Sequence, residues 1–273
     1  MKKLIINLGF ILGVSTMVVG CTDYLDSDYL FEERVNIENV FQSKDYTNEW
    51  LAKGYAYMKH DYLQQVNSKK NTSFNFADDM YYIDLNYVDW KGGNYTEKGL
   101  GSGNSLYIWQ AAYQAIRHVS IFIHNVDGNK ELTEAEITDM KGQAHFLRAY
   151  FYWMLIRSFG PVPIVPDEGV DYTKEYDEIA YPRSTYDECA DYIAEELVKA
   201  ATMLDDTRDV QNIVRPTRGA ALALRSRVLL YAASPLYNGQ APSEVIDALV
   251  DKSGRKLLSD TYDNRKWARA AAA

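Results

Sequence analysis

The chain is poor in the residues from which disulfide-linked and metal-dependent proteins are built. It has two cysteines and four histidines in 273 residues. The histidines are His60, His118, His124 and His145. None belongs to an HExxH or similar metal-ligand spacing, so we interpret them as structural and expect no metal and no cofactor. Cys189 lies at helical spacing from apolar residues and is predicted to be a core residue, because a single cysteine besides Cys21 cannot build a disulfide framework.

Signatures of catalysis are also missing. The sequence contains no G-x-S-x-G nucleophile elbow. The adjacent acids Asp78–Asp79 and Glu195–Glu196 are interpreted as solvated surface. A glycoside hydrolase needs two carboxyl groups that converge about 5–10 Å apart in a cleft, and no such pair is recognisable. The protein is therefore not expected to be an enzyme, and a secreted glycoside hydrolase is the least favoured function.

No segment shows the alternation of a β-strand, whereas helical periodicity recurs along the chain. The predicted helices cover residues 43–62, 104–125, 133–158, 186–204, 216–234 and a stretch that starts near 262. Thr133 to Glu136 has the pattern of a capping box, and Ser43 is a plausible N-cap. Antiparallel helices with small residues at contact positions predict an all-α, irregular tetratricopeptide-like array of helical hairpins with long loops.

Four arginines fall within these otherwise apolar helices. They are Arg148, Arg157, Arg218 and Arg225. A role in anion recognition would require them to converge at the surface. We predict instead that they bond helix-end carbonyls or carboxylates between hairpins.

The N-terminus has the layout of a secretory signal peptide, residues 1–20. Lys2 and Lys3 precede an uncharged apolar run, Leu4 to Val19, which is short for a membrane span; a membrane anchor helix is the alternative. Val-Val-Gly-Cys, ending at Cys21, resembles a bacterial lipobox, so Cys21 is expected to carry the lipid. Residues 21–42 are then predicted to be a lipidated tether and N-terminal arm, and 43–273 the helical domain.

Acidic residues outnumber basic ones. Without residues 1–20, the chain has 27 basic and 38 acidic side chains, a formal charge of −11. This charge argues against nucleic acid as a partner and against electrostatic attachment to anionic lipid. An acidic surface rich in tyrosine, with 22 in all, suits neutral polar ligands.

Aromatic residues are concentrated in one segment, Phe74 to Tyr95. Its 22 residues contain seven aromatics, where the average of 13% predicts about three. Tyr87, Trp90 and Tyr95 accompany Asp89 and Asn94 around a Gly-Gly turn. Sugar rings pack their C–H faces on Trp and Tyr, and carboxylates and amides bond their hydroxyls. The alternative, that these aromatics are packed in the fold, stays open.

Six blocks resemble the SusD/RagB family of outer-membrane lipoproteins of Bacteroidetes, in the same order. They are "CTDYLD", "IWQAAYQAIRHVSIFI", "GQAHFLRAYFYWMLIRSFGPVPIV", "YPRSTYDECADYIAEEL", "RPTRGAALALRSRVLLYAASP" and "YDNRKWARAAAA". The resemblance covers nearly all of residues 21–273. Family members are roughly twice as long, so the chain is similar to their N-terminal half, and the helical domain is expected to be incomplete at its C-terminal end.

The resemblance implies a function as well as a fold. Such proteins are anchored on the outside of the outer membrane, capture nutrients, usually oligosaccharides and sometimes peptides, and act as a lid on a TonB-dependent SusC-like transporter. Their glycan sites draw a Trp and an Asn from N-terminal loops, to which Trp90 and Asn94 are matched. The expected function is glycan binding and delivery to the transporter. The alternative is a peptide-binding or purely structural lid.

Overall fold

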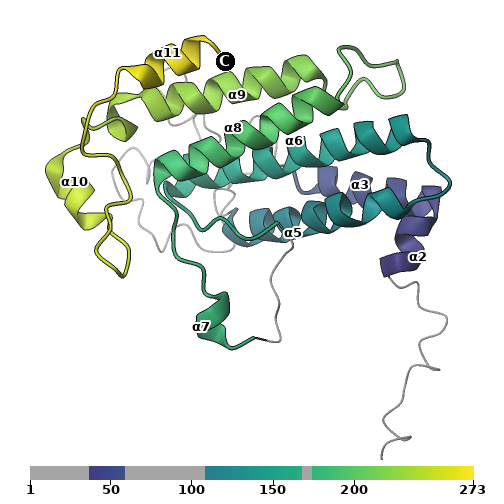
Figure 1. Ribbon diagram of the computed structural model, residues 1–273, viewed down its shortest axis with the longest axis horizontal. Coiled ribbons are helices and arrows are strands. Elements are labelled where there is room, and N and C mark those ends of the chain that lie inside the picture. The colour runs from purple at the N-terminus through teal and green to yellow at the C-terminus, as the bar shows by residue number, and fades with distance from the viewer. Residues whose placement is uncertain (1–36, 59–107, 168–173) are drawn as a thin grey trace, which may run out of the picture. The chain divides into compact units, whose positions relative to one another are not determined.

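The computed structural model describes residues 37–58, 108–167 and 174–273 (Figure 1). The chain divides into two units, residues 1–40 and 41–273. The described helices are α2 (Ile37–Gln42), α3 (Lys44–Ala56), α5 (Trp109–Asn125), α6 (Glu134–Phe159), α7 (Tyr176–Ile179), α8 (Tyr186–Met203), α9 (Arg218–Ala233), α10 (Ser243–Ala248) and α11 (Arg265–Ala271). Short 3₁₀ turns follow α5 at Val126–Gly128 and α9 at Pro235–Tyr237.

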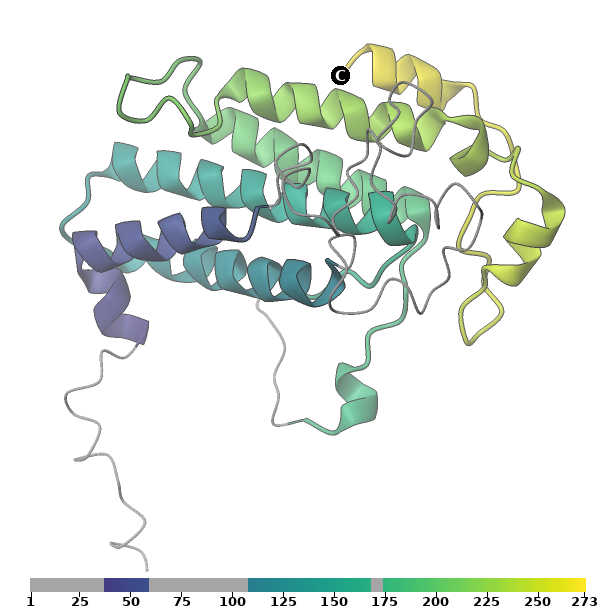
Figure 2. The same ribbon diagram turned by 180° about the vertical axis from the view of Figure 1, so that it is seen from behind.

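The long helices of the second unit pack on one another in chain order. α5 lies against α6, α6 against α8, and α8 against α9. Figure 1 shows these four side by side, with alternating direction. α3 covers α5 and α6, as Figure 2 shows from behind, and α11 packs on α9. The described residues contain no strand, only an isolated bridge between Val250 and Lys256, so the predicted all-α hairpin array is confirmed.

α6 is the central helix, and its second half is buried on almost every side. Thr133 and Glu136 form the predicted capping box, and Gly160, with φ of 70°, ends the helix before Pro161. Gly142 allows α8 to approach closely, because a Cβ there would lie 2.8 Å from Met203 Cβ. Apolar residues of α5, α6 and α8 therefore form one continuous core, which includes Cys189 as predicted.

Two details of the predicted helices are wrong. The first helix ends at Ala56, so Met58, which the predicted range 43–62 includes, lies beyond it. Tyr57 and Met58 donate to carbonyls only three residues back, at Gly54 and Tyr55, and this tightening closes the helix. The short helices α2, α7 and α10 were not predicted, because four to six residues are too few to show a period.

Candidate functional site

The predicted ligand residues lie outside the described part of the chain. Tyr87, Asp89, Trp90, Asn94 and Tyr95 belong to residues 59–107. The proposed lipidation site, Cys21, belongs to residues 1–36. These assignments stay predictions. Helix α8 carries residues of two charged clusters, one buried and one at the surface.

The buried charge cluster, centred on Glu196, joins α6 to α8. Glu196 is fully buried, and its Oε2 accepts from Arg148 Nε at 2.7 Å and lies 2.8 Å from His145 Nδ1. Its Oε1 accepts from Lys199 Nζ at 2.9 Å. Arg148, 1% exposed, continues to Asp167 at 3.2 Å. The cluster thus fastens the segment after α6 to the core.

The interpretation of Glu195 and Glu196 as solvated surface is wrong for Glu196. Glu195 is exposed, but Glu196 shares the inward face of α8 with Ile193 and Ala200. Burial raises the pKa of the Glu196 carboxyl, but hydrogen bonds and charges from His145 and Arg148 outweigh burial and hold that pKa well below its ordinary value. Glu196 is therefore an ionised partner in the core and not a candidate general acid.

The described histidines have structural partners, as predicted. His118 Nε2 lies 2.7 Å from the Trp50 carbonyl oxygen, and its ring stacks on the Trp50 indole at 4.6 Å. His124 Nε2 lies 2.6 Å from the Asp167 carbonyl oxygen, and His145 belongs to the buried charge cluster. His60 falls outside the described residues. Among the residues that are described, no group of three His, Cys, Asp or Glu side chains could hold a metal ion.

The arginine prediction is confirmed at two positions. Arg148 pairs with carboxylates of two other segments, and Arg218 Nε donates to the carbonyl of Ala201, in the last turn of α8, at 3.1 Å. Arg157 contacts the Met154 sulfur at 3.3 Å. Arg225 does not fit, since its buried Nε has no hydrogen-bond partner within the described segments.

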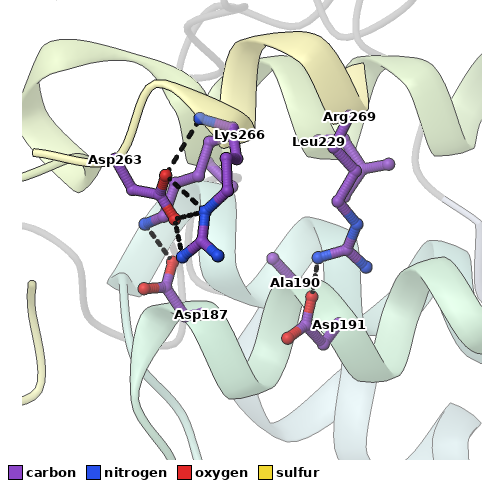
Figure 3. Close-up of a pocket in the computed structure, with 9 residues that line it drawn as sticks. Asp187, Ala190, Asp191, Leu229, Asp263, Lys266 and Arg269 are labelled. Atoms are coloured by element: carbon purple, nitrogen blue, oxygen red, sulfur yellow. Dashed lines mark hydrogen bonds and ion pairs between the residues drawn. The ribbon is translucent and has the colours of Figure 1, made fainter. Parts of the chain in front are cut away.

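The surface cluster surrounds a cavity of about 380 Å³ between α8, α9 and α11, here named the α8–α11 pocket. Its lining residues are Asp187, Ala190, Asp191, Leu229, Ala232, Asp263, Arg265, Lys266 and Arg269. Figure 3 shows the charged side chains in two groups, with Ala190 between them. The lining residues come from segments more than thirty positions apart in the sequence, so no local sequence motif predicts the pocket.

Two ion pairs bridge α8 and α11 across the pocket. Asp187 and Asp191 are four residues apart and share one face of α8. Lys266 Nζ lies 2.5 Å from Asp187 Oδ1, and Arg269 Nη1 pairs with Asp191 Oδ1 (Figure 3). Lys266 Nζ also donates to the Tyr237 carbonyl at 3.0 Å. Each acid that faces α11 thus meets a cation.

A buried asparagine positions the start of α11. Asn238 is fully buried; its Oδ1 accepts from Asp263 N–H at 2.8 Å and its Nδ2 donates to the Asp263 carbonyl at 3.0 Å. The next residue, Gly239, has φ of 72°, and a Cβ there would lie 2.2 Å from the backbone of Thr261. Asp263 then binds Arg265, which lowers the Asp263 pKa. The pocket wall is therefore fixed by backbone contacts.

None of the helices described is both long and apolar enough to cross a membrane. The apolar run Leu4 to Val19 lies outside the described residues.

Comparison with known proteins identifies relatives of the chain. Residues 23–230 match the SusD-like family described as "Starch-binding associating with outer membrane". The SusD-like protein P25 of Formosa agariphila is 33% identical over 55 residues, which are 20% of this chain and 10% of that protein. The solved structure of a protein named BT4246 has a TM-score of 0.66 and 26% identity, over 84% of this chain and 38% of that one.

A second solved structure, of a SusD-like protein from Bacteroides fragilis, shares the fold with a TM-score of 0.51. It is 24% identical over 71% of this chain and 36% of that protein. The chain thus spans less than two fifths of the length of these relatives. The family match covers about three quarters of the residues, from Asp23 through most of α9, and includes the helices that carry the buried charge cluster. The chain belongs to the SusD-like family.

Proposed function

We propose that the protein is a cell-surface lipoprotein that binds an extracellular oligosaccharide or polysaccharide and delivers it to a TonB-dependent SusC-like transporter. The observation that carries this proposal is the family match over residues 23–230. The family's description joins starch binding to association with the outer membrane. The acidic, tyrosine-rich composition is compatible with a neutral polar ligand.

The lipid anchor is placed at Cys21, with residues 1–20 removed as a signal peptide. A basic start, an apolar run and a lipobox-like Val-Val-Gly-Cys support this assignment. Acyl chains on the N-terminal cysteine hold the protein on the outer membrane, facing outward. Incorporation of labelled palmitate into the wild type, but not into Cys21→Ala, is the expected result.

The glycan site is placed on the aromatic segment. Trp90, Tyr87 and Tyr95 supply flat apolar faces, and Asp89 and Asn94 supply hydrogen-bonding groups. Binding without cleavage needs only such preformed stacking and hydrogen bonding, so no catalytic residue is assigned. A peptide-binding or structural lid is the second candidate, and it requires these aromatics to be buried in the fold.

Trp90→Ala is the test of this site. The purified mature protein is screened by affinity electrophoresis in gels that contain a panel of polysaccharides, and by calorimetry against peptides. We expect Trp90→Ala to lose most of the retention, because stacking on the indole is removed, while its circular dichroism stays unchanged. The control is Tyr46→Ala on α3, an aromatic that is about half exposed. Equal retention of Trp90→Ala and wild type contradicts the assignment.

Delivery is tested with the transporter itself. Detergent extracts of cells that express the tagged protein are expected to yield the SusC-like transporter as a co-purifying partner. Its absence from a crosslinked extract contradicts the delivery part of the proposal and leaves glycan binding in place.

A further inference from the structure

We propose that the α8–α11 pocket is a second saccharide site, and that it accepts an uncharged sugar ring. The choice of ligand class rests on the proposed glycan-binding function. The site itself is argued from described residues alone and does not involve the aromatic segment.

The size and floor of the pocket suit a sugar ring. Its volume of about 380 Å³ lies in the lower part of the range of small-molecule sites. Ala190, Leu229 and Ala232 are the apolar residues of the lining and form its floor. Figure 3 shows Ala190 between the two groups of charges. A pyranose has an apolar C–H face and a rim of hydroxyls, so it can contact the floor and the charged walls at once.

The charges of the pocket favour a neutral ligand over an ion. Three aspartates face three cations among the lining residues, so their formal charges cancel. Asp187 pairs with Lys266, Asp191 with Arg269, and Asp263 with Arg265. The lining therefore offers an ionic ligand no net charge of opposite sign.

The paired groups still have hydrogen-bonding capacity to offer. Asp187 and Asp191 each use one oxygen in an ion pair, and in the described residues the second oxygen accepts no hydrogen bond. Arg269 uses one of its five N–H groups in the same way. A hydroxyl both donates and accepts, so a polyol can bond carboxylates and guanidinium together, whereas a pure acceptor or a pure donor satisfies only half of the walls.

These groups are held in place before any ligand arrives. The side chains of Asp187, Asp191 and Arg269 are 40–48% exposed, which makes them reachable, and each is oriented by its partner. Lys266 is fixed further by the Tyr237 carbonyl. Preorganised hydrogen-bonding groups bind with a smaller loss of conformational entropy than free side chains do.

The described residues of the lining include no aromatic side chain, so a single ring is expected to bind more weakly here than on a tryptophan. A weak second site still matters for a polymer. When one polysaccharide occupies both sites at once, its retention rises well above that given by either site alone. The pocket would thus add to the capture of polysaccharide more than to the capture of a monosaccharide.

Fluorine NMR of protein labelled with 5-fluorotryptophan tests the pocket and the aromatic segment separately. Trp267 is next in sequence to the lining residue Lys266 on α11 and serves as the probe near the pocket. Trp90 is the probe of the predicted glycan segment, and both signals are assigned from Trp→Phe variants. The probes are D-glucose, D-galactose, D-mannose and D-xylose, with glucuronate and glucosamine as charged counterparts. At least one neutral sugar is expected to shift the Trp267 signal saturably, and the charged counterparts to bind more weakly.

Asp191→Asn/Arg269→Gln is expected to raise the dissociation constant at Trp267 about tenfold, because two charge-assisted bonds are weakened. Arg265→Gln changes a side chain that is 91% exposed, so it is expected to leave the fold intact and to give a smaller loss. The matched control is Arg227→Gln, on the exposed face of α9 outside the pocket.

The proposal is overturned if none of the four neutral sugars shifts the Trp267 signal. It is also overturned if the pocket variants bind sugar like the control, or if a charged sugar binds more tightly than the neutral ones. A shift at Trp267 with none at Trp90 leaves the pocket standing, and the aromatic site is then decided by the gel retention of Trp90→Ala.

Discussion

The two charged clusters both lie on α8 and both pair carboxylates with guanidinium and ammonium groups, yet they differ in burial. Around Glu196 a carboxylate, a guanidinium and an imidazole are packed between α6 and α8 with almost no exposure. Around Asp187 and Asp191 the carboxylates are 40% and 48% exposed. Both carboxylate oxygens of Glu196 are used by internal partners, whereas at the surface some hydrogen-bonding positions remain for a ligand. Burial, rather than residue type, separates a structural ion pair from a candidate site.

The largest expected effect is that of removing the buried carboxylate. Glu196→Ala leaves Arg148 and His145 without their shared acceptor in a sealed interface. We expect the free energy of unfolding in urea to fall by about 3–5 kcal/mol. Glu195→Ala, one residue away and exposed, is the control and should change it by less than about 0.5 kcal/mol. Similar losses for both variants would contradict the burial of Glu196.

The second prediction concerns how the stabilisation by Glu196 depends on pH. The pKa of Glu196 is lower in the folded protein than its ordinary value of 4.5. A depressed folded pKa gives stability that is present above pH 4.5 and is lost as the pH falls from there toward the folded value. The stability difference between wild type and Glu196→Gln should therefore hold near pH 5 and shrink between pH 4.5 and pH 3. A stability difference that grows as the pH falls would contradict the prediction that the ionised Glu196 stabilises the fold.

Arg148→Lys sharpens the comparison by keeping the charge and removing the planar fork. Arg148 reaches Glu196, Ser120 and Asp167 from three nitrogens, and a lysine ammonium has one point of charge for all of them. The expected loss is about 1–3 kcal/mol in thermal or urea unfolding. Arg227→Lys on the exposed face of α9 should be neutral. A neutral Arg148→Lys would mean that charge alone holds the segment that carries Asp167.

The sequence predicts the helices well where the signal is local. The capping box at Thr133 depends on residues within a few positions of the helix start, and it is found. The predicted helix end at 158 lies one residue before the observed end at Phe159. The phase of α8 already groups Glu196 with Ile193 and Ala200, so its burial was accessible to helical periodicity, although its partners were not. Arg148 and His145 lie 48 and 51 residues away, and only the packing of α6 on α8 brings them there.

The α8–α11 pocket could not be predicted for the same reason. Asp187 and Lys266 are 79 residues apart, and each alone is an ordinary surface charge. Their encounter depends on the turn fixed by Asn238 and on α11 lying beside α9. The aromatic segment, by contrast, was found from composition alone, because its residues are contiguous. A site whose residues are contiguous can be recognised in the sequence. A site assembled from distant helices can be recognised only when the fold is known.

The smallest expected effect belongs to the exposed pair. Asp191→Asn removes the charge that faces Arg269, and half-exposed pairs of this kind contribute about 0.2–1 kcal/mol. Because such a pair is screened by ions, the difference from wild type should vanish in about 1 M sodium chloride, where the Debye length is about 3 Å. The deficit of Glu196→Ala should survive the same salt, since its partners Arg148 and His145 are shielded from water and ions. If Asp191→Asn instead cost more than about 2 kcal/mol at every salt concentration, the pair would be structural, and its groups would not be free to serve a ligand.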